Sequence, residues 1–520
     1  MTNLIRTKEN ADFTWRPPVV NDRTRADGFG SLVTASFIVA VTAGIFCMTS
    51  NQFEHWFMIP ISICGVLMGA DAIEWFRGRL DLCDPVGLIG ILGFHFFFVA
   101  PLLHVKWDFW MHEVSPPADW RDWLGYMGLL NVVGLIFYRL GRRFFDLRST
   151  PHATFWEIDK ARFRIVMPLC IAISAAMQIW VYRQMGGIAG YMDARLNNPT
   201  AFIGFGWVFM ISESAPILMA FFIIMKLRRR KINWMLVGGA LLALFMVQML
   251  FGGLRGSRSE TVQLLFWVVG CIHFLLRPVP RKLVYVGCAF LFAFMYFYGF
   301  YKDMGVKATE VLSSSEEREQ MATQTGRTAE ALALGDFGRA DVQAFILYRL
   351  IDDPRDFTYA KGRTYLGALA LLVPQAILSN KPETKLKEGT EIETGTGGYV
   401  PGELWSSRVY GLAGEAMLNF GPVAVPFAYG IFGFLLGWFK KRAYALLPGD
   451  ARFLLVPFGV YFCLSVMSGD SDNLVFGLAK DGFLPILVVC ICSVRSKLFV
   501  HKFVPIYSYP VREQTGHPIS

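Results

Sequence analysis

The stretch FGGLRGSRSETV, residues 251–262, places Arg255 and Arg258 in a turn of glycines and serines. A long apolar run ends just before this turn, and another begins just after it. A guanidinium stays protonated at physiological pH and matches carboxylate or phosphate oxygens with two parallel hydrogen bonds. The free N–H groups of the turn, and of a helix starting near Glu260, add to anion binding. The turn is therefore a candidate anion site, and snorkelling of both arginines to lipid phosphates is the competing interpretation.

Further basic residues belong to the same predicted face of the membrane, and together they form the set that an anionic ligand would require. These residues are Arg195, Arg339, Arg363 and Arg408.

Carboxylates are the second chemical component. Glu213 lies near the middle of an apolar run, where a charge is costly and is normally either functional or paired with another helix. Glu415, within YGLAGEAMLNFGP, is expected near the outer membrane boundary. Asp341 and Glu403 are expected in a long outer loop. Each is a candidate base toward a hydroxyl group, and Glu415 is the first choice, with Asp341 the second.

We expect neither a metal nor a cofactor. Asp470 and Asp472 have the spacing of an acidic metal-binding pair, but short acidic turns between helices are common. The 9 cysteines are scattered, mostly within apolar runs, and show no metal-ligand spacing. Neither a phosphate-binding loop nor a dinucleotide-binding motif is found in the sequence.

The elements that must position these residues are membrane helices. The chain has 520 residues, of which 54% are hydrophobic, and apolar runs of membrane-spanning length recur along it. This pattern predicts an all-α polytopic membrane protein with about twelve transmembrane helices. The predicted spans are 31–49, 56–73, 85–103, 122–140, 163–182, 201–225, 233–252, 260–276, 282–300, 421–439, 451–468 and 481–496.

Arginine and lysine positions predict the orientation, because cytoplasmic loops carry the positive charge. The N-terminal tail and the connections that follow each even-numbered span are basic, so both termini are expected inside. The net charge of +9 follows from these loops and indicates anionic membrane lipid as a partner, not nucleic acid. The predicted division is a cytoplasmic tail (1–30), nine spans (31–300), a large outer loop (301–408), three spans (409–496) and a second cytoplasmic tail (497–520).

The outer loop, 301–408, nearly balances acidic and basic residues, as expected of a translocated segment. Serines and acidic residues predict a helix start in 313–337, and 339–351 has amphipathic helical spacing. The run 364–378 is short for a span and contains Pro374. We predict that it is a re-entrant or interfacial helix, which would place a cavity on the outer side.

Four phrases, in this order, resemble bacterial oligosaccharide repeat-unit polymerases, the Wzy-type O-antigen and exopolysaccharide polymerases. Their order and number carry the resemblance, which extends from about the fifth predicted span to the eleventh. The phrases are GGIAGYMDARL (186–196), GLRGSRSETV (253–262), YAKGRTYLGALALLVPQAILSNKP (359–382) and GLAGEAMLNFGPVAVPFAYGIFGFLLGWF (411–439).

The resemblance implies a metal-independent glycosyltransferase of GT-C-like architecture in the bacterial inner membrane, with its site facing the periplasm. Its donor would be a growing glycan on undecaprenyl diphosphate, and its acceptor a single repeat unit on the same lipid. Arg255 and Arg258 would stabilise the leaving diphosphate. Arg195 and Arg339 would be further contacts, and a chain-length regulator of the co-polymerase type would be a partner.

Two other functions remain open. An O-antigen ligase has similar architecture but typically relies on a histidine in the large outer loop, and no histidine lies between His273 and His501. A flippase or transporter for lipid-linked glycans would favour pseudo-symmetric halves with charges along a central path. No internal repeat is found, and the charges gather on one predicted face.

Overall fold

A computed structural model of the chain describes residues 24–111, 114–145, 154–202, 204–228, 232–256, 258–305, 319–322, 328–353, 357–374, 377–400 and 408–497. The first half holds α1 (Thr24–Thr49), η1 (Asn51–Phe53), α2 (Met58–Phe76), α3 (Pro85–Phe94), η2 (His95–Val99), α4 (Ala100–Trp107), α5 (Trp120–Arg143), β1 (Thr154–Ile158), α6 (Lys160–Gln184), α7 (Gly187–Asn197), η3 (Pro199–Phe202), α8 (Gly206–Ser212), α9 (Ala215–Leu227) and α10 (Trp234–Leu250).

The second half contains shorter helices between two groups of long ones. Its elements are η4 (Gly253–Arg255), α11 (Arg258–Leu275), α12 (Arg281–Met304), η6 (Ala331–Asp336), α14 (Ala340–Ile351), α15 (Arg363–Ala370), α16 (Lys385–Thr394), α17 (Gly411–Phe420), α18 (Ala424–Tyr444), η7 (Ala451–Leu454), α19 (Val456–Ser468), α20 (Ser471–Cys492) and β2 (Ser493–Lys497).

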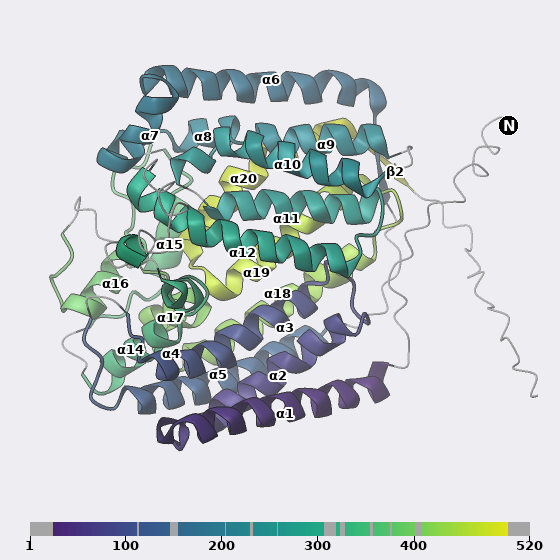
Figure 1. Cartoon of the computed structure of the whole chain (residues 1–520). Helices are drawn as coiled ribbons and strands as arrows, with labels where there is room; N and C mark the ends of the chain where they lie inside the picture. Colours follow the sequence, from purple (N-terminus) through teal and green to yellow (C-terminus); the bar gives the residue numbers. More distant parts are fainter. Residues whose placement is uncertain are drawn as a thin grey trace, which may run out of the picture.

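The long helices run side by side in one bundle, and the short elements gather at its two ends (Figure 1). One end, which we call the loop end, carries α7 and α14 to α17 (Figure 1). The other, the sheet end, carries β1 and β2, which pair antiparallel with Thr154 opposite Lys497 and Ile158 opposite Ser493. The segment between α12 and α18 therefore forms a layer at the loop end.

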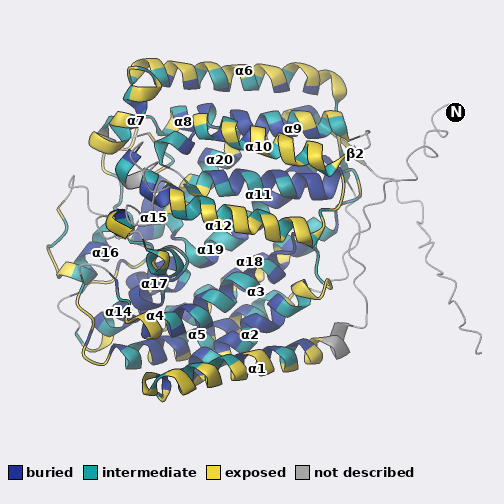
Figure 2. Ribbon diagram, in the orientation of Figure 1, coloured by how far each residue is buried: buried dark blue, intermediate teal, exposed yellow. Residues whose placement is uncertain are grey.

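The outer helices of the bundle expose apolar side chains, and the inner helices bury theirs (Figure 2). On α1, Phe37 is 69% and Met48 is 90% exposed; Ile165 on α6 is 69% exposed. By contrast Trp267 on α11 and Leu436 on α18 are almost fully buried. Such apolar exposure is costly in water but favourable against lipid chains, which supports a membrane environment.

Basic connections that were predicted on one side of the membrane lie together at the sheet end. Lys440 Nζ is 2.7 Å from Asp84 Oδ2. Arg281 donates to the Leu80 carbonyl at 2.9 Å. Arg452 likewise donates to the Thr154 carbonyl at 2.8 Å. These contacts join the connections after α2, α5, α11 and α18, and the side of the membrane that they face stays a prediction.

Eight described helical segments are long and apolar enough to cross a membrane, which shows a multi-pass protein. They are Gly28–Thr49, Met58–Phe76, Pro85–Trp107, Trp120–Arg143, Lys160–Gln184, Gly206–Leu227, Arg281–Tyr301 and Ser471–Cys492. The other predicted ranges hold α10, α11, α18 and α19, which are shorter or more polar. The count of twelve spans therefore stays a prediction.

Several element boundaries differ from the predicted ones. The span predicted at 201–225 is interrupted between α8 and α9, and the last span begins at Ser471 rather than at 481. Residues 493–497, placed mostly in the last span, form strand β2. In the run 364–378, α15 is only eight residues long. The amphipathic helix predicted at 339–351 is confirmed as α14.

Residues 313–318 and 323–327 of the helix predicted at 313–337 lie outside the described residues. Within the described part, Ala331–Asp336 forms a π-helical turn. Its Ala333 carbonyl lies 3.0 Å from Nε2 of His95, which belongs to a second π-helical turn, His95–Val99. The two wide turns thus lie against each other at the loop end. Sequence periodicity predicted neither, because a π turn inserts one residue without changing residue types.

Candidate functional site

Asp470 attaches the start of α17 to the start of α20. The N–H groups of Tyr410 and Gly411 donate to its carboxylate at 3.0 Å and 2.7 Å. The first N–H groups of a helix have no partner within that helix, so a neighbouring side chain satisfies them here. Gly411 has a φ of +70°, which glycine adopts without strain. Residues four apart share one helix face, so Glu415 also faces α20.

Glu415 is only 3% exposed, and side chains from three helices surround it. Thr364 Oγ1 donates to Oε1 at 2.7 Å, and the Ser471 N–H donates to Oε2 at 2.6 Å. Asn419 in turn donates to Thr364 Oγ1 at 2.7 Å. Burial raises the pKa of Glu415, and the nearby charge of Asp470 raises it further, whereas the hydrogen bonds from Ser471 and Thr364 oppose the shift. The carboxyl is thus held in a fixed geometry with an increased tendency to keep its proton.

The turn before α15 carries two cationic residues, Lys361 and Arg363, and contacts the helix that carries Glu415. The Lys361 N–H donates to the Asn419 carbonyl at 3.0 Å, and the Gly362 N–H donates to Asn419 Oδ1 at 2.9 Å. Lys361 is exposed. Arg363, the neighbour of the threonine that binds Glu415, pairs with Glu388 but leaves 38% of its side chain exposed. The turn that carries Lys361 and Arg363 therefore contacts Asn419, a member of the Glu415 network.

Lys385 is the buried counter-ion of the acidic turn before α20. Its ammonium contacts Asp470 and lies 3.3 Å from Asp472 Oδ1. Burial raises the pKa of Asp470, and the positive charge of Lys385 opposes this shift. The pair Asp470 and Asp472, whose spacing resembled a metal site, thus holds a lysine. Within the described ranges, no group of three or more His, Cys, Asp or Glu residues is arranged to hold a metal.

Arg255 belongs to a second polar cluster. Its Nε and Nη2 lie 3.1 Å from the two carboxylate oxygens of Glu213, and Nη2 is also 3.1 Å from Glu260 Oε1. Lys480 Nζ is 2.5 Å from Glu213 Oε2 and also contacts Glu260. The guanidinium carbon lies 4.4 Å from the ring centre of Phe209. The mid-membrane carboxylate Glu213 is therefore paired, as one of its two interpretations required.

The two clusters share helix α20 but occupy different levels of it. Ser471 contacts Glu415, and Lys480 contacts Glu213. At 1.5 Å of rise per residue, these two α20 positions are about 14 Å apart along the helix axis. The Arg255 cluster therefore does not directly contact the Glu415 carboxyl.

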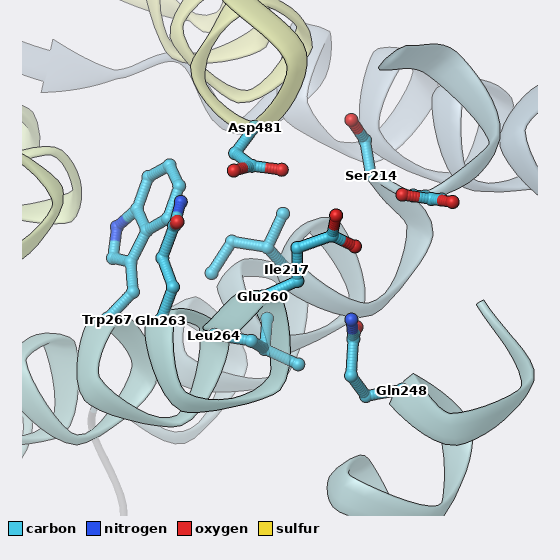
Figure 3. A pocket seen from close by; sticks show the side chains of 9 residues that line it. Ser214, Ile217, Gln248, Glu260, Gln263, Leu264, Trp267 and Asp481 are labelled. Atoms are coloured by element: carbon cyan, nitrogen blue, oxygen red, sulfur yellow. The ribbon is translucent and has the colours of Figure 1, made fainter. Parts of the chain in front are cut away.

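A small cavity of about 30 Å³ opens beside the Arg255 cluster (Figure 3). Its lining combines carboxylates and amides with a few apolar side chains. The lining residues are Glu213, Ser214, Ile217, Gln248, Glu260, Gln263, Leu264, Trp267 and Asp481.

Arg195 lies against the 252–256 turn. A Cβ added at Gly256 would be 2.6 Å from Arg195 Nε, and this glycine has a φ of +99°. Arg195 pairs with no carboxylate in the part of the chain that the structure describes. Arg258 begins α11 and is half-buried. The structure therefore brings Arg195 to the turn that carries Arg255, as the sequence suggested for an outer cationic group.

The remaining predicted arginines lie elsewhere. Arg339 Nη1 donates to the Gly338 carbonyl at 2.6 Å, at the start of α14. Arg408 Nε lies 2.9 Å from Glu393 Oε1 on α16. The six predicted arginines thus divide among the 252–258 turn, the α14 start and the α15–α16 region, and do not converge on one point. Glu403 lies outside the described residues.

Asp341, the second candidate base, faces another element. Its Oδ1 lies 3.7 Å from His104 Nε2 on α4 and accepts the Val342 N–H at 2.8 Å. On the same helix α14, Gln343 donates to the Tyr410 carbonyl at 3.0 Å and so contacts the start of α17. No described contact joins Asp341 to Glu415. Of the two carboxyls, Glu415 is the one whose hydrogen-bond network contacts the turn that carries Lys361 and Arg363.

Sequence reasoning missed most partners of these two clusters. Thr364 and Ser471 carry no signal, because hydroxyl side chains are common and lie more than fifty residues from Glu415 along the chain. Lys480 did have a signal. It precedes Asp481 within an apolar run, but the predicted last span begins at 481 and leaves Lys480 outside it.

Comparison with family models, with curated proteins and with solved structures finds no match. The structure therefore shows a multi-pass helical membrane protein with two buried polar clusters. The likeness of its phrases to repeat-unit polymerases stays a prediction.

Proposed function

We propose that this protein is a glycosyltransferase that polymerises oligosaccharide repeat units carried on undecaprenyl diphosphate. The observation that carries the proposal is the position of Glu415, a buried carboxyl that accepts a hydrogen bond from Thr364, the residue that directly follows the cationic Lys361–Arg363 turn. A base next to positive charge is what transfer from a diphosphate leaving group requires. The four phrases that resemble the polymerase family support the same function, and two of them contain these residues.

In the proposed reaction, Glu415 acts as the base. The acceptor's sugar hydroxyl attacks the anomeric carbon of the donor glycan, and Glu415 takes the hydroxyl proton. The bond between that carbon and the diphosphate oxygen breaks, and its electron pair leaves with the lipid diphosphate. Thr364 and Ser471 keep the carboxyl oriented throughout.

The leaving diphosphate gains negative charge, and fixed cations lower the energy of that state. Lys361 and Arg363 are the cations nearest the Glu415 network along the chain. We assign the diphosphate to them first. Arg195 and Arg258 would bind a more distant phosphate or glycan group, and Arg255 would hold their turn through Glu213.

The proposal includes a location. The loop end faces the periplasm, the sheet end faces the cytoplasm, and about twelve spans cross the bacterial inner membrane. The basic sheet end supports this orientation, because positive loops stay cytoplasmic. The product would serve O-antigen, capsule or exopolysaccharide, and a chain-length regulator is the proposed partner.

The direct test is polymerisation by the purified protein in lipid vesicles supplied with a lipid-diphosphate-linked repeat unit. Wild-type protein should lengthen the glycan and release lipid diphosphate. Loss of a general base typically lowers the reaction rate by about 10²–10⁴-fold, so Glu415→Gln should polymerise more slowly than wild type by a factor in that range. Glu391→Gln, on neighbouring α16, is the matched control and should keep the wild-type rate. Full activity of Glu415→Gln would contradict the proposed mechanism, in which Glu415 is the base.

Transport of the same lipid-linked glycans is the second candidate. The observation in its favour is the interrupted helix α8–α9, whose Glu213 pairs with Arg255 and Lys480 among membrane helices. Broken helices with buried charges are typical of transporters. Movement of a labelled lipid-linked repeat unit between leaflets, without any lengthening of the glycan, would favour transport over polymerisation.

A further inference from the structure

The membrane segment Gly206–Leu227 is broken where it passes the Arg255 cluster. Helix α8 ends at Ser212, and α9 begins at Ala215. Pro216 has no N–H group, so the Ser212 carbonyl lacks the donor that a regular helix would supply four residues later. Free backbone carbonyls are tolerated at membrane depth where they line a cavity, and discontinuous helices use them to coordinate small cations.

The cavity beside this break has room for at least one water-sized particle. Its volume is about 30 Å³, and a single water needs at least about 10–15 Å³ of such space. The break itself contributes Glu213 and Ser214 to the lining. Asp481 enters from α20 and Glu260 from α11 (Figure 3).

One carboxylate at the cavity, Asp481, does not take part in the ion pairs that surround it. Arg255 and Lys480 both pair with Glu213, and both also pair with Glu260. Asp481 forms no ion pair with a described residue; Gln263 gives it a side-chain hydrogen bond. Asp481 is thus a carboxylate at the cavity that has no ion pair with a described residue. A buried carboxylate among membrane helices is costly unless a positive charge neutralises it.

Gln248 gives an independent indication of a ligand. It is 3% exposed, projects from α10 toward the carboxylates, and its amide has no hydrogen-bond partner among the described residues (Figure 3). A buried amide normally has a partner, so its position indicates an occupant of the cavity. The amide oxygen is a neutral ligand suited to a hard cation, as is the Gln263 amide.

We propose that this cavity binds one monovalent cation, a proton on Asp481 or a sodium ion beside it. Asp481 supplies the negative charge, and Gln248 and Gln263 supply neutral oxygens. The inference does not depend on the proposed glycosyl transfer, because every residue involved belongs to the second cluster.

Other titratable groups border this site and belong to its electrostatics. They are the ion-paired Arg255, Glu213, Glu260 and Lys480, and tyrosines from α6, α7, α12 and α19, namely Tyr182, Tyr191, Tyr298 and Tyr461.

The test is modification of full-length purified protein by dicyclohexylcarbodiimide, which reacts with protonated carboxyls in apolar surroundings. Modified peptides are located by mass spectrometry, in sodium chloride or choline chloride of equal ionic strength. If the occupant is a proton, the rate at which Asp481 is modified falls by about tenfold per pH unit above the pH at which half of Asp481 is protonated. Sodium chloride then has no effect on this rate. If the occupant is sodium, sodium chloride protects Asp481 at fixed pH. An Asp481 that is never modified, or that responds to neither pH nor sodium, overturns the proposal.

A second readout uses the thermal unfolding midpoint of the same protein. In wild type, the midpoint should shift with pH or with sodium, whichever cation occupies the cavity. Asp481→Asn should lose the shift with sodium and should show a smaller shift with pH, because its amide carries no charge while Glu415 and other groups still titrate. Asp193→Asn, an exposed carboxylate on α7, is the control and should keep it. Equal shifts in Asp481→Asn and wild type would also overturn the proposal.

Discussion

Carboxylates hold several of the arginines at the loop end. Arg255 is clamped by Glu213 and Glu260, and Arg408 by Glu393. A guanidinium in low-dielectric surroundings must find an opposite charge, since leaving it unpaired costs several kcal/mol. An arginine beside an apolar run can therefore be a structural ion-pair partner as well as a ligand contact. A structural ion-pair partner is buried, whereas a ligand contact is accessible to solvent. The exposure of Lys361 and Arg363 therefore favours these two residues as ligand contacts.

Removal of Arg255 tests its structural role. Arg255→Ala leaves Glu213, whose side chain is 4% exposed, with only Lys480 as counter-ion. Breaking a buried ion pair from one side costs about 3–5 kcal/mol, so the free energy of unfolding should drop by about that amount. Denaturant titration in detergent measures it. Arg183→Ala, at an exposed position, is the control and should change stability by less than about 0.5 kcal/mol. Equal stability of both variants would contradict a structural role for the ion pairs of Arg255 with Glu213 and Glu260.

The raised pKa of Glu415 predicts the sign of a pH effect. The folded protein holds this proton to a higher pH than the unfolded chain does, because burial disfavours the carboxylate. Its contribution to stability is therefore full below the ordinary carboxyl range and is lost as pH rises through the raised pKa. The glutamine of Glu415→Gln cannot titrate, so this variant should not show the decrease in stability that Glu415 causes as pH rises. Thermal unfolding of both proteins across pH measures it, and parallel pH profiles would contradict the assignment.

At the scale of elements, periodicity and apolar length predicted the helices well. Each predicted span overlaps a helix, and α14 lies where amphipathic spacing placed it. The α8–α9 break, the two π-helical turns and the β1–β2 pair were not predicted. Pro216 was the available signal for the break. Strand β2 depends on pairing with β1, more than three hundred residues away, which no local pattern can indicate.

Within the site, Glu415 was predicted from its residue type and its place near a span boundary. Its partners Thr364, Ser471 and Asn419 were not, because their contacts arise only when α15, α17 and α20 pack together. A sequence pattern shows which groups have suitable chemistry. Long-range packing decides which of those groups meet.

Close packing of α5 against α18 gives a prediction at the same scale. A Cβ at Gly433 would lie 2.1 Å from the Tyr138 carbonyl oxygen, and one at Gly141 would lie 2.3 Å from that of Gly430. Small residues let membrane helices approach this closely. Gly433→Ala should therefore cost about 1–3 kcal/mol of stability by overpacking. Gly44→Ala, where nothing lies within 4 Å, is the control, and denaturant titration should show no loss there.

At the scale of the whole molecule, the two ends differ in kind. The sheet end joins basic connections through Lys440, Arg281 and Arg452, whereas the loop end carries the layer α14 to α17 and the Glu415 network (Figure 1).

Orientation is the prediction that belongs to this scale. Single cysteines are placed at Asp193 on α7 and at Glu157 on β1, both exposed, in a background whose native cysteines are replaced. Asp193→Cys should react with a membrane-impermeant maleimide in intact cells. Glu157→Cys should react only after the inner membrane is permeabilised. The reverse pattern would place the Glu415 network in the cytoplasm.

The most direct measurement of the central claim is a gel of surface polysaccharide from a deletion strain, with lipid-linked intermediates analysed alongside. The proposed function predicts core carrying one repeat unit and no ladder, restored by the wild-type gene but not by an equally expressed Glu415→Gln. Long polymer retained on undecaprenyl diphosphate would instead indicate a ligase. Single repeat units trapped on the cytoplasmic side would indicate a flippase. Either result, or an unchanged ladder, would contradict polymerisation at Glu415.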